Sequence, residues 1–173
     1  MASAIRSYRG VFTSERKDND GWVIVTKGIA GVGRDAHVDP HCAAHYVDGG
    51  IVPVGTGHPV RMENYLAPGR IEHCETPDGL PAVRVYFDAT EAQAAGKVPV
   101  FEGIAIGKHE DEAGTTWVTR CVLAAVALVP ADKSVNPDCT LEVLGVDGEW
   151  LPVPADLTFE SLNKGLDALK ALP

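Results

Sequence analysis

The chain has 173 residues, the size of one ordinary domain. Hydrophobic residues make up 45% of it and charged residues 23%, a balance that is typical of a globular protein and excludes an intrinsically disordered one. The formal net charge of −9 disfavours phosphate backbones and anionic membrane surfaces, so we expect neither nucleic acid nor membrane as a partner.

No segment is typical of export or of membrane insertion. The arginines near the N-terminus are not followed by the apolar region of a signal peptide. The longest apolar run, Cys121 to Ala131, is too short to span a bilayer, so we expect a soluble protein made in a cytosol. The cysteines are widely spaced and never form a CxxC pair, which predicts free thiols and leaves open cross-links formed later in an oxidising medium. They are Cys42, Cys74, Cys121 and Cys139.

In chain order, residues 4–13 alternate apolar and polar side chains and predict a first strand. A polar turn that ends in Asp20-Gly21 is a hairpin signal, and residues 21–33 predict the next strand. The glycines of GIAGVG within it lack the GxGxxG spacing, and no helix pattern follows. A phosphate-binding loop is therefore not predicted.

Residues 35–45, DAHVDPHCAAH, are rich in side chains that bind metals. A helical turn opened by Pro40 would bring His41 and His45 onto one face, a spacing that zinc accepts. The alternative is a polar loop with surface histidines, which we favour because no second element of a zinc motif is present. The candidate ligands are His37, His41, Cys42 and His45.

Three further strands are predicted at residues 51–54, 69–74 and 80–87. Residues 59–68 between them are expected to be irregular. Residues 88–96 predict a short helix, with Asp88 as its N-cap and Gly96 as its stop.

The stretch from Val100 to Ala131 contains two apolar runs, VPVFEGIAIG and WVTRCVLAAVALVPA, separated by the polar turn KHEDEAGTT. It predicts a pair of core strands around which the rest of the chain packs. Residues 136–145 predict one more strand. A closing helix follows, with an apolar stripe that needs a surface to pack on. The stripe consists of Leu162, Leu166 and Leu169.

These elements amount to about eight strands and two or three short helices, which predict an α+β, mainly β fold. We expect a closed or half-closed antiparallel β-barrel. Residues 1–155 would form the barrel, and residues 156–173 would form a C-terminal helix that packs on it or on a partner, within a single domain overall.

Nucleophilic hydrolysis needs a serine, threonine or cysteine beside a base, with oxyanion donors nearby. The serines are few and none lies in a GxSxG motif, although Ser134 follows the second core strand in the loop ADKSVNP. His58, in a glycine-rich loop after a predicted strand, is the natural candidate for a base. A lone histidine is nevertheless more often structural.

Several of these motifs carry a resemblance through their order and spacing. They are DAHVDP, GGIVPVGTGH, GRIEHCETPDGLPAVRVYF, FEGIAIG and VLAAVALVPADKSVNP. Over residues 20–140 the chain resembles the tailed-phage prohead (capsid maturation) serine protease family, which is similar in fold to the herpesvirus assemblins. Each motif is short and degenerate, so the resemblance rests on their succession.

Carried over position by position, the resemblance implies that His58 matches the family's catalytic histidine. The nucleophilic serine, in a strand reading roughly SIG, falls on Ala105, and the acidic position of a strand reading roughly EVSLVP falls on Ala125. A methyl group cannot attack a carbonyl, and loss of a triad nucleophile removes nearly all of the chemistry. We therefore expect no catalytic residue, only three vestigial positions.

The favoured hypothesis is a non-catalytic phage virion protein on a protease-like scaffold, either a capsid decoration (cement) protein or a minor head protein. Its expected partners are capsid or other virion proteins, with a homo-oligomer left open. We expect no cofactor, and a location in the virion after synthesis in the host cytoplasm. One alternative is an active prohead maturation serine or cysteine protease that uses His58 as its base. A second is a metal-binding module at residues 35–45.

Overall fold

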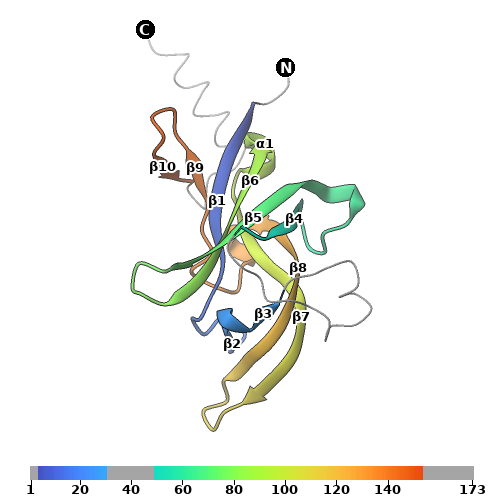
Figure 1. The fold of residues 1–173 in the computed structure, drawn as a ribbon, viewed down its shortest axis with the longest axis vertical. Coiled ribbons are helices and arrows are strands. Elements are labelled where there is room, and N and C mark those ends of the chain that lie inside the picture. Colours follow the sequence, from blue (N-terminus) through green and yellow to red (C-terminus); the bar gives the residue numbers. More distant parts are fainter. Residues whose placement is uncertain (1–3, 31–48, 154–173) are drawn as a thin grey trace.

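The computed structural model of the chain describes residues 4–30 and 49–153 (Figure 1). The predicted metal ligands of residues 35–45 and the predicted closing helix lie outside these residues. In the part of the chain that is described, no helix has the length and apolar character needed to cross a membrane.

The described residues form ten strands and one short α-helix. The strands of the first half are β1 (Ile5–Ser14), β2 (Trp22–Ile24), β3 (Ile29–Ala30), β4 (Ile51–Thr56) and β5 (Tyr65–Glu75). Those of the second half are β6 (Pro81–Thr90), β7 (Lys97–Glu110), β8 (Thr116–Pro130), β9 (Glu142–Leu144) and β10 (Trp150–Pro152). The helix is α1 (Glu91–Ala94), and 3-10 turns lie at Thr26–Gly28, Met62–Asn64 and Ala131–Lys133.

All ten strands belong to one sheet, in the order β10-β9-β1-β6-β5-β4-β8-β2, with β3 and β7 also paired to β8. β8 is its organising strand. It pairs with β7 along one edge in an antiparallel hairpin, while its other edge takes β2, β3 and β4, all parallel to it. The long β7–β8 hairpin extends away from the β1–β6–β5 layer (Figure 1).

The sequence of β8 explains its central place. Every residue from Cys121 to Val129 except Ala124 is buried. A strand that is covered on both faces is expected to be continuously apolar rather than alternating, which is how this run reads. The 3-10 turn before β3 approaches the strand so closely that a side chain at Gly28 would clash with the carbonyl oxygen of Thr119. The prediction of a core strand pair between residues 100 and 131 is confirmed.

The mainly β class is confirmed, but the closed or half-closed antiparallel barrel is not, because the sheet is mixed and does not close. The sheet ends at β10 and β2, which are three residues each and do not pair. β1 approaches β7 where Gly10 faces Pro99, yet no backbone pairing joins them there. β1 pairs with β6 along one edge, and its other edge takes β9 at Tyr8 and Arg9 and the backbone N–H of Thr140 at Val11, rather than β7.

Three predicted elements have different bounds in the structure. The helix expected at 88–96 is reduced to α1, because β6 continues to Thr90, which replaces Asp88 as the N-cap and accepts a hydrogen bond from the backbone of Gln93. Residues 59–68, expected to be irregular, include the start of β5. The strand expected at 136–145 forms only at β9, because its first half is a loop held by side-chain hydrogen bonds.

Candidate functional site

The three positions carried over from the protease resemblance lie on different elements. His58 follows β4 in an exposed loop, and its peptide bond to Pro59 is cis. Ala105 is exposed on β7, whereas Ala125 is buried in β8 with 4% of its surface accessible. Ala125 therefore offers almost no surface to a substrate.

The strand register keeps these positions apart. β4 runs parallel to β8 and ends with Thr56 beside Leu128. His58 therefore lies near the C-terminal end of β8. Ala105 pairs with Cys121. Cys121 and Leu128 are seven positions apart on one strand, which is roughly 23 Å at about 3.3 Å per residue. The structure therefore does not bring Ala105 into contact distance of His58.

A carboxylate does lie across from Ala125. It belongs to Glu102, the partner of Ala125 in the β7–β8 register. Its two oxygens accept hydrogen bonds from the backbone N–H of Val60 at 3.1 and 2.9 Å. Glu102 thus fixes the loop after His58 through the main chain, and it does not orient the imidazole as the acid of a triad would.

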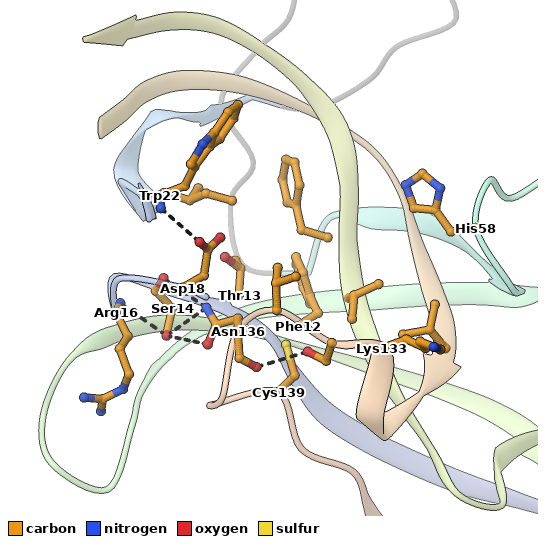
Figure 2. Close-up of a pocket in the computed structure, with 16 residues that line it drawn as sticks. Phe12, Thr13, Ser14, Arg16, Asp18, Trp22, His58, Lys133, Asn136 and Cys139 are labelled. Carbon is orange, nitrogen blue, oxygen red and sulfur yellow. Dashed lines mark hydrogen bonds between the residues drawn. The ribbon is translucent and has the colours of Figure 1, made fainter. Parts of the chain in front are cut away.

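The site that does contain His58 is a cleft between the end of β1, β2, β7 and the loop after β8 (Figure 2). Its volume is about 370 Å³, within the range of small-molecule sites. Most of the lining is apolar. The apolar side chains are Phe12, Trp22, Ile24, Val100, Phe101, Val129 and Val135.

Polar groups at one end of the cleft are tied to each other. Ser14 Oγ donates a hydrogen bond to Asp138 Oδ2 at 2.7 Å, and Asn136 Nδ2 donates to Ser14 Oγ at 3.2 Å. Arg16 Nε donates to the same Asp138 oxygen at 2.8 Å, and Arg16 Nη2 donates to both oxygens of Asp78, at 2.7 and 2.6 Å. This network joins the end of β1 to the loop after β8 and leaves the Ser14 hydroxyl committed to structure.

The other candidate hydroxyl and thiol groups, in the cleft and in the core of β8, are poor nucleophiles. Ser134 Oγ donates to the backbone oxygen of Asn136 at 3.0 Å. Burial raises the pKa of the Cys139 thiol, which lines the cleft, to about 11. Burial likewise raises the pKa of Cys121, in the core of β8, to about 12. Both residues are free thiols, as predicted, and at neutral pH they lack the thiolate that attacks a carbonyl.

Three groups that line the cleft make no polar contact of their own. The Thr13 side chain is 1% exposed, and its hydroxyl oxygen has no hydrogen-bond partner. Within the described part of the chain, neither His58 nor Lys133 has a hydrogen-bond or ion-pair partner. The cleft thus combines an apolar body with two exposed rim groups that are available to a ligand, and it holds one buried hydroxyl without a partner.

Sequence reasoning found His58 and Ser134 but missed Thr13 and Lys133. Thr13 carries no signal in the sequence, because only its burial without a partner makes it unusual. Lys133 stands next to Ser134 in the loop ADKSVNP. The sequence indicated this loop as a candidate through Ser134, but it gave no reason to choose the lysine. Among residues 4–30 and 49–153, no cluster of three or more metal-binding side chains occurs.

The chain was compared with protein-family models, with curated proteins and with solved structures, and none of them matches it. The resemblance to prohead proteases therefore remains a prediction from motif order.

Proposed function

We propose that this protein is a non-catalytic binding protein of a phage virion, one that associates with the capsid as a decoration or minor head protein. The observation that carries the non-catalytic part is the composition of the cleft at His58. A base is present, but every described hydroxyl or thiol in the cleft is tied to another group, buried without contact to His58, or held as a neutral thiol.

The binding part rests on the same cleft. An apolar cavity with a few polar groups around it is what ligand recognition requires. His58 and Lys133 keep their hydrogen-bonding capacity for a partner, since no described side chain uses it. The virion and capsid assignment rests on the resemblance of the motif order to prohead proteases.

Sedimentation tests the proposal. The purified chain is mixed with assembled capsids of the phage that encodes it, and the pelleted fraction is measured against chain concentration. We expect saturation at a fixed ratio of chain to capsid subunit and no shortening of either protein on a gel. Absence of co-sedimentation at micromolar chain would contradict a capsid role.

A protease is the second candidate, and one observation favours it, namely that His58 and Ser134 line the same cleft. The capsid precursor, incubated with the chain, would then be cut at a defined position. His58→Ala and Ser134→Ala would each abolish that cleavage, while Ser7→Ala on the outer part of β1 would not. Specific cleavage with this dependence would replace the non-catalytic proposal.

A further inference from the structure

We propose that the cleft binds the apolar C-terminal segment of a partner protein, with the terminal carboxylate at Lys133 and a peptide carbonyl on the Thr13 hydroxyl. This inference rests on the proposed binding function and names the chemistry of the segment that the partner presents.

The apolar body of the cleft selects the kind of side chain. Phe12 and Val129 come from β1 and β8, while Val100 and Phe101 come from β7. Trp22 stands at the margin with 36% of its surface exposed. Such a lining gains free energy by covering leucine, valine or phenylalanine side chains, because both surfaces leave water.

The Thr13 hydroxyl could donate a hydrogen bond to a polar atom of a ligand that enters this apolar body. A buried hydroxyl without a partner destabilises the protein unless another group supplies the hydrogen bond. Thr13 is also drawn as lining the cleft between Asp18 and Phe12 (Figure 2). A peptide carbonyl that enters with its apolar side chains would accept the hydrogen bond.

Charge then orients the segment. Of the cations that line the cleft, Arg16 is occupied by Asp78 and Asp138, whereas Lys133 is unpaired among the described residues. His58 stands on the same side of the view as Lys133, and Asp18 stands on the opposite side (Figure 2). A carboxylate is attracted to the Lys133 end and repelled from the Asp18 end.

A fatty acid would share the apolar chain and the carboxylate, but its hydrocarbon offers Thr13 no acceptor. The peptide satisfies all three features of the cleft at once. That difference makes the peptide the better occupant and gives the experiment its comparison.

The test is calorimetric titration of the full chain with an acetylated pentapeptide that ends in two leucines. We expect the free-carboxylate peptide to bind and its C-terminal amide to bind about tenfold more weakly, because a charge-assisted contact is lost. Lys133→Gln should lower the affinity for the free-carboxylate peptide by a similar factor and leave the affinity for the amide unchanged. Lys27→Gln, at an exposed lysine outside the cleft, is the matched control. Thr13→Val should weaken both peptides about fivefold.

Three results would overturn the inference. They are no peptide binding at millimolar concentration, equal affinity for acid and amide, and decanoate that binds in a Lys133-dependent manner more tightly than the peptide. The last result would assign the cleft to a fatty acid. Capsid co-sedimentation of the unmodified chain, measured in parallel, separates the two proposals. If the chain pellets with capsids but ignores the peptide, only the peptide inference fails.

Discussion

Two regions of this molecule treat polar groups in opposite ways. The centre of β8, from Cys121 to Val129, is continuously apolar and almost wholly buried. At the cleft, the end of β1 meets the loop after β8 through a dense set of side-chain hydrogen bonds around Ser14 and Asp138. The resemblance to a protease placed chemistry in the first region, but the polar groups gather in the second.

The difference teaches that burial decides where a ligand can be recognised. At Ala125 a polar side chain would need partners in packed surroundings, and the carboxylate across from it, Glu102, is already bonded to the backbone of Val60. At the cleft the polar groups lie at strand ends and in loops, where partners are at hand, as Ser14 finds in Asp138 and Asn136. A substitution in the centre of β8 should therefore leave the cleft intact, and a substitution in the cleft should leave the centre of β8 intact.

The largest effect is expected in β8. Leu123 is completely buried, so Leu123→Ala should lower the free energy of unfolding by about 2–5 kcal/mol through lost burial and a residual cavity. Urea unfolding followed by circular dichroism measures it. Ile104→Ala on neighbouring β7, where the side chain is 54% exposed, should change stability by less than about 0.5 kcal/mol. Equal losses in the two variants would refute the assignment of β8 as the core strand.

The cleft network should give the next effect. Ser14→Ala removes the donor to Asp138 and the acceptor for Asn136, so we expect a loss of about 1–3 kcal/mol in the free energy of unfolding. Ser7 lies on the same strand and donates to Asp88 in an exposed pair. Ser7→Ala is therefore the control, with an expected change below about 0.5 kcal/mol. A harmless Ser14→Ala would mean that the network does not hold the cleft together.

Two buried threonines should respond in opposite directions. Thr13→Val removes a hydroxyl that has no partner, so the free energy of unfolding should rise by about 1 kcal/mol. Thr26, also buried, donates to Glu15 at 3.1 Å, and Thr26→Val should destabilise the protein. Urea unfolding followed by circular dichroism measures the free energy of unfolding of both variants. Destabilisation by Thr13→Val would show that the hydroxyl contributes to folding and would remove the argument that it is kept for a ligand.

The sequence predicted these two regions unequally, for physical reasons. The apolar run of β8 is a local pattern, so its burial could be predicted from consecutive residues. The sheet order could not, because it depends on which edge of β8 the parallel strands occupy. The cleft was missed as a unit because Ser14 and Asp138 are 124 positions apart in the chain. Only His58 and Ser134 stood out beforehand, each as an isolated candidate.

The smallest effect concerns pH and the ion pair that holds Arg16 at the cleft. The hydrogen bonds from the Arg16 guanidinium lower the pKa of the Asp78 carboxyl to about 2. Because this pKa is depressed by folding, its stabilising contribution is present above the carboxyl's ordinary pKa of 3.8 and is lost as the pH falls through about 2. Asp78→Asn should therefore be less stable than the unmodified chain at pH 6, with the gap closing below pH 3. Because the pair is exposed, the gap should be the smallest of the four and should shrink in high salt. A gap that stayed constant across this range would mean that the contribution of Asp78 does not come from its charge.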